Sequence, residues 1–181
     1  GISKMGISKE KIISAISKFK GLKRRLEKRF EGNITIFDDI AHSPEKANSV
    51  LKNLREIYPK KSGLKIIAVF EPNIGGRQRN SIEKYDNAFK NVDIVIIPRL
   101  TKLKLAENTD EKPMEGDELA LTISKTHNNA IYMTDDSELV KFLKVNSKKG
   151  DIVVFLGSHG FRGMIEETIN LISISPHPQS P

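Results

Sequence analysis

The stretch Ile66-Ile67-Ala68-Val69-Phe70 is an unbroken apolar run of the length of one strand. Two similar runs follow it along the chain, at Val92–Ile97 and Ile152–Leu156. A continuous apolar run indicates a strand that is covered on both faces, because a strand with one wet face alternates polar and apolar residues. The three runs therefore favour a mainly parallel sheet between layers of helices.

The segments between these runs are typical of helices. Ser43-Pro44 supplies an N-cap and a proline at the first helical position, so we expect a helix from there to about Tyr58. The other expected elements are helices at Ile82–Phe89, Glu118–Ser124, Ser137–Val145 and Met164–Ile172, and a short strand at Ala130–Met133. Arg99–Pro113 is polar and irregular, and is expected to form a long functional loop.

The first forty residues add a helix and a hairpin. Ser8 can cap a helix whose apolar residues follow helical spacing: Ile12, Ile13, Ala15, Ile16 and Phe19. Leu26–Phe30 and Ile34–Phe37 flank the turn residues Glu31-Gly32-Asn33, which predicts a β-hairpin. The fold class predicted from the pattern is α/β: a three-layer sandwich with a mostly parallel sheet of about six strands and one antiparallel edge strand.

Length and composition suit one domain. The chain has 181 residues, of which 38% are hydrophobic. We expect the domain to span residues 7–172, with disordered or vector-derived ends at 1–6 and 173–181. Because there is no cysteine, disulfides, thiolate metal sites and cysteine nucleophiles are excluded. No apolar run is long enough to span a bilayer, and we expect a cytoplasmic protein without a membrane partner.

The net charge of +7 admits three interpretations: nucleic-acid binding, small anionic ligands, or a solvated lysine-rich face. The chain has three tyrosines and no tryptophan for base stacking. We therefore expect no specific nucleic-acid partner, and the lysine-rich face is favoured.

Three strand-to-helix turns carry polar side chains. In open α/β sheets, ligands bind beyond the carboxyl ends of the strands, so these turns are the candidate site. The first turn is Asp38-Asp39-Ile40-Ala41-His42-Ser43-Pro44. Its carboxylates could hold ribose hydroxyls or a hydrated Mg²⁺, and His42 could donate to a phosphate beside a helix N-terminus. Alternatively, Asp38 and Asp39 only stabilise the turn and His42 forms a helix-entry hydrogen bond.

The second turn, Phe70–Arg79, contains Asn73 and a Gly-Gly pair followed by Arg77. We expect Arg77 on a surface loop, with a guanidinium free to bind a carboxylate or phosphate; the alternative is a solvent-facing loop without function. The third turn, Gly157-Ser158-His159-Gly160-Phe161-Arg162-Gly163, predicts either close backbone approach to a ligand or tight turn packing.

Several catalytic motifs are missing from the sequence. There is no G-x-x-x-x-G-K-[ST] loop for ATP phosphates, no G-x-S-x-G elbow and no H-E-x-x-H pair. No set of protein metal ligands is predicted. The chain offers a binding surface without a complete catalytic apparatus.

At these turns the sequence resembles the carboxy-terminal domain of the Mur ligases. Asp38–Pro44 is similar to the motif D-D-[YF]-[AG]-H-H-P, and Phe70-Glu71-Pro72 to F-[QE]-P, in the branch that contains the UDP-N-acetylmuramate–L-alanine ligases and the murein peptide ligases. The remaining matches are Phe19–Glu27, Gly116-Asp117, Lys149–Val154 and Gly157–Gly163. The last turn is closer to the S-N-G-G-F-G-G of the murein peptide ligases.

The resemblance implies a Rossmann-like domain that closes over a central ATPase domain and binds the incoming amino acid or peptide. The implied reaction joins it to a UDP-linked muramyl precursor through an acyl phosphate, with ATP and Mg²⁺ bound mainly by the central domain. Asp38 and Asp39 would lie at the nucleotide ribose or a metal-bound water, and His42 and Arg77 would be catalytic. The implied substrate-binding residues are Asn73, Arg77, Ser158, His159 and Gly160.

The sequence departs from the branch's motifs at Ile40, at Ser43 and at Asn73-Ile74-Gly75. An alanine ligase, a murein peptide ligase and a divergent relative are therefore all open. Two other classes remain as alternatives: a stand-alone Rossmann-like nucleotide-binding module and a basic nucleic-acid-binding protein. A lone domain of a ligase is expected to bind ligands but to be inactive.

Overall fold

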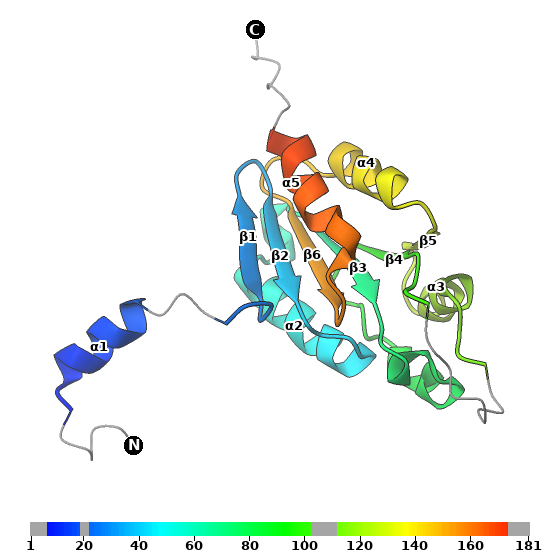
Figure 1. Cartoon of the computed structure of the whole chain (residues 1–181), viewed down its shortest axis with the longest axis horizontal. Helices are drawn as coiled ribbons and strands as arrows, with labels where there is room; N and C mark the ends of the chain where they lie inside the picture. The colour runs from blue at the N-terminus through cyan, green and yellow to red at the C-terminus, as the bar shows by residue number, and fades with distance from the viewer. Residues whose placement is uncertain (1–6, 19–21, 103–111, 174–181) are drawn as a thin grey trace, which may run out of the picture.

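The computed structural model describes residues 7–18, 22–102 and 112–173, and shows one six-stranded sheet with helices on both faces (Figure 1). The strands are β1 (Glu27–Glu31), β2 (Thr35–Asp39), β3 (Ile66–Glu71), β4 (Ile94–Pro98), β5 (Ala130–Met133) and β6 (Ile152–Gly157). The α-helices are α1 (Lys9–Lys18), α2 (Pro44–Ile57), α3 (Gly116–Ser124), α4 (Asp136–Asn146) and α5 (Met164–Ser173). The 3-10 helices of the described residues are η2 (Lys60–Ser62), η3 (Gly75–Arg77), η4 (Arg79–Tyr85) and η5 (Phe161–Gly163).

The strand order is β1-β2-β6-β3-β4-β5. Within the described ranges, β1 pairs with β2 in the antiparallel sense, through the predicted hairpin, and the other four strand pairings are parallel. The predicted fold class, with its antiparallel edge strand, is confirmed. The last strand, β6, lies in the middle of the sheet between β2 and β3.

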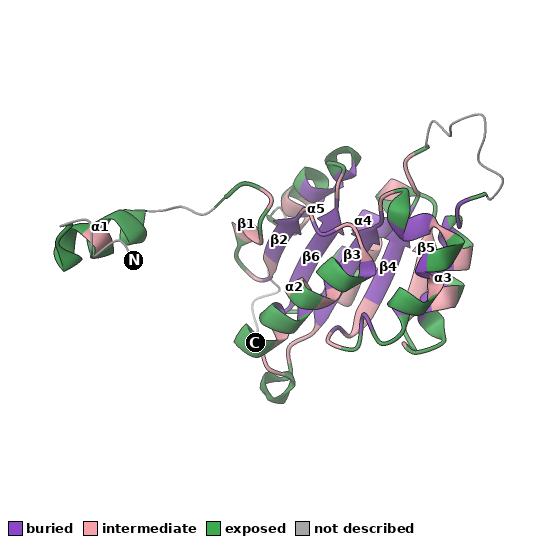
Figure 2. Cartoon of the chain, turned by 90° about the horizontal axis from the view of Figure 1, so that it is seen from below, coloured by how far each residue is buried: buried purple, intermediate pink, exposed green. Residues whose placement is uncertain are grey.

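The central strands are buried on both faces (Figure 2). Along β3, Ile66, Ala68 and Phe70 pack into the cluster that contains the apolar residues of α2 and α3. The intervening Ile67 and Val69 pack into a second cluster with α4 and α5. This alternation between two covered faces is the physical reason for the unbroken apolar run.

Helices α2 and α4 begin directly after residues whose side chains cap them. The Ser43 hydroxyl accepts from the Lys46 N–H at 3.4 Å, with Pro44 as the first helical residue of α2. The Asp135 carboxylate accepts from the Glu138 N–H at 2.9 Å and caps α4. The predicted helices at these positions are confirmed.

The helical stretch predicted at Ile82–Phe89 is confirmed only up to Tyr85, and it is not an α-helix. The chain instead forms the tighter η4, followed by turns up to β4. Two hydroxyl groups of η4 bond to the preceding glycine turn: Ser81 donates to the Gly75 carbonyl and Tyr85 to the Gly76 carbonyl, both at 2.7 Å. These bonds hold the segment against the turn, and their partners could not be seen from local periodicity.

The predicted helix after Ser8 is confirmed as α1, but none of its residues is buried. Ile13 and Ile16 are 55% and 67% exposed. Three parts of the prediction lie outside the described residues. They are the apolar residue Phe19, most of the loop at Arg99–Pro113, and the terminal tails except residue 173. In the described part of the chain, no helix is both long and apolar enough to cross a membrane.

The amino ends of the strands are held together by Asp151, which is fully buried. One carboxylate oxygen accepts from the Lys65 N–H at 2.8 Å and the other from the Lys148 N–H at 2.9 Å. The side chain thereby joins the segments that enter β3 and β6.

We expect Asp151→Asn to lower the free energy of unfolding by about 1–3 kcal/mol, because the amide nitrogen would face an N–H donor and leave it unsatisfied. Urea denaturation of the chain measures the loss. Asp86→Asn, at an exposed position, is the control and should change stability by less than about 0.5 kcal/mol. Equal stability of the two variants would contradict the role of Asp151.

Candidate functional site

The three polar turns meet at one edge of the sheet. In the parallel register, Asp39 of β2 pairs with Leu156 of β6, and Gly157 of β6 pairs with Glu71 of β3. The turns that follow these strands are therefore neighbours, with the turn after β6 in the middle. This is the carboxyl edge, where ligands bind in open α/β sheets.

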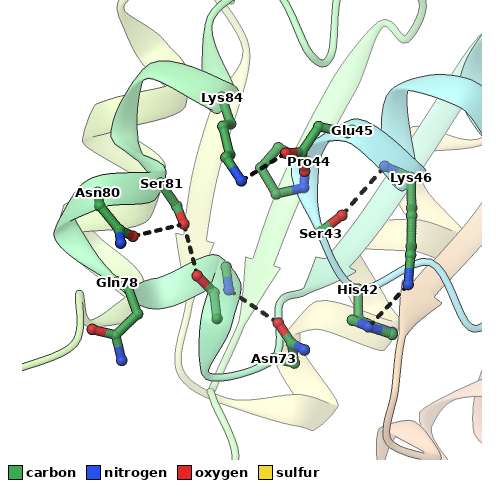
Figure 3. A pocket seen from close by; sticks show the side chains of 12 residues that line it. His42, Ser43, Pro44, Glu45, Lys46, Asn73, Gln78, Asn80, Ser81 and Lys84 are labelled. Carbon is green, nitrogen blue, oxygen red and sulfur yellow. Dashed lines mark hydrogen bonds and ion pairs between the residues drawn. The ribbon is translucent and has the colours of Figure 1, made fainter.

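A pocket of about 600 Å³ opens at this edge between the start of α2 and the segment around η3 and η4 (Figure 3). The predicted site residues His42 and Asn73 both line it. Its cationic side chains are Lys46 and Lys84, and the latter pairs with Glu45 at 3.0 Å. The remaining lining residues are Ser43, Pro44, Gly75, Gly76, Gln78, Asn80 and Ser81.

The ring of His42 is held in one tautomer. Its Nδ1 lies 2.7 Å from the Ile40 carbonyl oxygen, which can only accept, so Nδ1 carries the proton and donates. Its Nε2 lies 3.4 Å from the Lys46 ammonium and accepts from it. The predicted helix-entry hydrogen bond of His42 is thus present, and Nε2 supplies the ring's lone pair on the pocket side.

Asn73 fixes the glycine turn next to the pocket. Its side-chain oxygen accepts from the Gly76 N–H at 3.0 Å, and its own N–H donates to the His42 carbonyl at 3.1 Å. The turn after β3 is therefore tied directly to the turn after β2. A Cβ on Gly76 would lie 3.0 Å from Pro72 and 3.3 Å from the His42 carbonyl, so this close approach favours glycine.

Asp38 lies beneath two arginines rather than in the pocket. Its side chain is 2% exposed and pairs with Arg24 at 3.2 Å and Arg29 at 3.4 Å. Burial raises the pKa of the Asp38 carboxyl, and the neighbouring Arg24 and Arg29 counteract part of that rise.

Asp39 is also engaged within the protein. One of its carboxylate oxygens accepts from the Leu26 N–H at 2.6 Å and the other from the Ala41 N–H at 2.8 Å. The turn-stabilising interpretation accounts for the contacts of both Asp38 and Asp39. Their roles toward a nucleotide stay predictions.

The expectation that Arg77 lies on a surface loop is wrong. The residue is 4% exposed. Its guanidinium donates to the Met114 carbonyl at 2.9 Å and to the Thr101 carbonyl at 3.4 Å, and pairs with Glu115 at 3.0 Å. Thr101 lies at the start of the connection between β4 and α3, and Met114 and Glu115 lie at its end, so Arg77 joins the two ends of that connection. Its catalytic and substrate-binding roles stay predictions.

The predicted substrate residues Ser158, His159 and Gly160 follow β6 and are half-buried or exposed. They do not line the pocket formed by His42 and Asn73. Their backbone is bound by Arg24, which donates to the Ser158 carbonyl at 2.9 Å and the His159 carbonyl at 2.8 Å. Sequence reasoning missed Arg24, which belongs to a lysine- and arginine-rich stretch without a distinguishing local pattern.

A second group of charged residues at this edge was also missed. The Glu71 side chain is 2% exposed; it accepts from the Thr101 N–H at 2.8 Å and pairs with Arg162 at 3.2 Å. Arg162 also binds both carboxylate oxygens of Asp136, which receives Arg99 as well. The hydrogen bond from Arg162 is the largest cause that lowers the pKa of Asp136, and Arg99 contributes to the same effect.

The donors of the pocket suit an anion. Within the described residues, no three or more carboxylate or imidazole side chains are grouped so that they could hold a metal ion. Lys46 and Lys84, the latter paired with Glu45, stand instead beside the first turn of α2, where the helix dipole favours negative charge.

A family model described as the glutamate ligase domain of the Mur ligases matches residues 24–159. The chain belongs to the Mur ligase family. It is 32% identical over 168 residues to a UDP-N-acetylmuramate–L-alanine ligase from Microcystis aeruginosa, covering 92% of this chain and 34% of that protein. It is 33% identical over 156 residues to the enzyme of that name from Acetivibrio thermocellus. That match covers 85% of this chain and 32% of that protein.

Solved Mur ligase structures share the fold of this domain. The UDP-N-acetylmuramate–alanine ligase from Thermotoga maritima superposes with a TM-score of 0.70 at 18% identity, covering 94% of this chain and 35% of that one. The murein peptide ligase from Psychrobacter arcticus gives a TM-score of 0.67 at 20% identity, covering 97% and 35%. The chain spans about a third of the length of these Mur ligases, as expected for their carboxy-terminal domain.

We expect Arg77→Lys to destabilise the domain by about 1–3 kcal/mol, because an ammonium cannot reproduce the planar set of bonds to two carbonyls and a carboxylate. Thermal or urea unfolding of the chain measures this loss. Arg79→Lys is the matched control, since Arg79 is 43% exposed and pairs with the half-exposed Glu118. A stability loss no larger for Arg77→Lys than for Arg79→Lys would show that the buried bonds of Arg77 contribute little to the stability of the domain.

The lowered pKa of Asp136 predicts a pH dependence of stability. Because the folded carboxyl binds its proton less tightly than the unfolded chain, its contribution is present above the ordinary value of 3.8 and is lost as the pH falls through the folded pKa. Asp136→Asn should cost about 0.5–1.5 kcal/mol at pH 7. Urea titrations should show that the difference in the free energy of unfolding between Asp136→Asn and wild type shrinks toward pH 3. A difference that stays constant with pH would contradict the stabilising role of the Asp136 carboxylate.

Proposed function

We propose that this chain is the carboxy-terminal domain of an ATP-dependent ligase that joins an amino acid or a peptide to a UDP-linked muramyl precursor through an acyl phosphate. The domain binds ligands but requires a central ATPase domain for chemistry. The protein would act in the cytoplasm, in peptidoglycan synthesis or recycling.

The observation that carries the proposal is the pocket at the carboxyl edge, together with membership of the Mur ligase family. The pocket combines a helix N-terminus, two ammonium groups and the Nε2 of His42 in a volume of about 600 Å³. The ammonium groups and the helix N-terminus fit a phosphate or a carboxylate, the two anionic groups of an acyl-phosphate reaction, and Nε2 of His42 supplies an acceptor beside them.

Within this proposal, Lys46, Lys84 and the first turn of α2 stabilise negative charge on a phosphoryl group that the central domain presents. Neutral His42 can accept a proton at Nε2 from an attacking amine, while its Nδ1–H bond to Ile40 holds the ring in place. Nitrogen attack on the acyl carbon would then form the amide as phosphate leaves.

The incoming amino acid or peptide would bind between the pocket and the turn after β6. Asn73 and the Ser158–Gly160 turn follow the adjacent strands β3 and β6, so both can contact one ligand. With the partners that it has here, Arg77 would not contact the substrate. Its guanidinium would instead support the site by binding the connection that follows β4. Asp38 and Asp39 would support the nucleotide side of the site.

ATP and Mg²⁺ would be bound mainly outside this chain. ATP supplies the phosphoryl group that activates the carboxylate. The sequence has no phosphate-binding G-K-[ST] loop. The carboxylates of Asp38 and Asp39 are engaged by arginines and backbone N–H groups, and Glu45, which lines the pocket, pairs with Lys84. They therefore do not form a Mg²⁺ site of their own in this arrangement.

The isolated chain should show no ATP hydrolysis above a blank and no amide formation, because nothing in it orients the β- and γ-phosphates. Phosphate release with Mg·ATP measures the first activity, and mass spectrometry of the products the second. An ATPase activity that copurifies with the chain and is abolished by His42→Asn would contradict the proposed division of labour.

In the complete ligase, His42→Asn should lower kcat by at least about tenfold, as expected for loss of a positioned proton acceptor. His127→Asn is the matched control: that ring bonds to the Val92 carbonyl at 3.2 Å and lines a different hollow, with Lys60 and Lys90. Steady-state kinetics separate the two variants. Normal kcat for His42→Asn would remove His42 from the reaction.

A further inference from the structure

One arginine joins the turn after β6 to the end of β2. The Arg24 Nε donates to both carboxylate oxygens of Asp38, at 3.2 and 3.3 Å. Its Nη1 donates to the Ser158 carbonyl at 2.9 Å, and its Nη2 to the Gly157 carbonyl at 2.6 Å and the His159 carbonyl at 2.8 Å. A single guanidinium thus binds three consecutive carbonyl groups and one buried carboxylate.

The backbone of Arg24 is held as firmly as its side chain. Its φ is +52°, in the left-handed region that non-glycine residues rarely adopt. Its N–H donates to the Glu27 carboxylate at 2.8 Å, and its carbonyl accepts from the Ile40 N–H at 3.0 Å. The uncommon conformation persists because both backbone groups and the guanidinium are bound at once.

The three carbonyl contacts determine how the turn faces a ligand. In a planar trans peptide, the N–H points opposite to the carbonyl of the same unit. With the carbonyls of Gly157, Ser158 and His159 directed at Arg24, the N–H groups of Ser158, His159 and Gly160 point away from it. Successive N–H groups presented in this way can bind an anionic group.

We propose that Arg24 is a positioning residue for the incoming substrate: it holds the turn at 157–160 so that its N–H groups bind the carboxylate of the amino acid or peptide. The inference rests on the proposed function and deepens it. Arg24 itself touches neither substrate nor nucleotide. Arginine is required because its planar fork reaches several acceptors at fixed angles, whereas the ammonium of lysine cannot.

Arg29 provides a matched control. It also bonds to Asp38, at 3.4 Å, but its other partner is Glu166 and it has no bond to the turn. Arg24 and Arg29 are similarly exposed, at 27% and 28%. Replacing either removes an ion pair to the same buried carboxylate, so a purely structural effect should appear in both variants.

The test uses the complete ligase with Arg24→Met, Arg24→Lys and Arg29→Met. Both Arg24 variants should raise the KM for the amine substrate about tenfold or more, the factor that loss of one charged hydrogen bond produces, with a smaller change in the KM for ATP. Arg29→Met should leave the amine KM within about twofold. An unchanged amine KM for Arg24→Lys, or an equal rise in Arg29→Met, would overturn the inference.

A second measurement needs no activity. In the isolated chain, Arg24→Lys should shift the amide NMR signals of Ser158, His159 and Gly160 strongly, whereas Arg29→Met should leave them in place. Undisturbed signals in Arg24→Lys would refute the positioning of the turn by Arg24, even if the ligase reaction itself were shown. The signals could shift as expected while the wild-type complete protein forms no amide. In that case the proposed function fails, and the positioning of the turn by Arg24 still holds.

Discussion

The site depends on one constraint, the parallel pairing of β6 between β2 and β3. Val154 of β6 pairs with Phe37 on one side and Ala68 on the other, so the last strand of the chain becomes the centre of the sheet. Only this order brings the turn after β6 next to the turns that carry His42 and Asn73. It also places three carbonyls within reach of Arg24, a residue more than 130 positions earlier.

Local sequence predicted most of the elements because their signals are local. The two covered faces of β3 require apolar residues at every position, and Ser43-Pro44 matches the start of α2. The helical stretch expected at Ile82–Phe89 is a 3-10 helix that ends at Tyr85, and hydroxyl bonds to Gly75 and Gly76 hold it in place. The strand order was not predicted, since it depends on which non-local edges pair.

The three turns singled out in the sequence are neighbours at one edge of the sheet, but what each side chain in them contacts depends on distant partners. Arg77 has the appearance of a free ligand-binding group in the sequence, yet Met114 and Glu115, almost forty residues later, bury it. Glu71 and Arg162 pair across 91 residues. Such pairings leave no periodic signal, so burial and charge compensation at the site could not be derived from the sequence alone.

The central claim is that ligands bind at the carboxyl edge of the sheet. The most direct measurement is amide NMR of the isotope-labelled chain during titration with ADP and inorganic phosphate at millimolar concentration. We expect shifts confined to Ser43–Lys46, Asn73–Gly76 and Ser158–Gly160, which lie on three adjacent turns. Shifts centred instead on Lys60, Lys90 and His127, or no shifts at all, would contradict it.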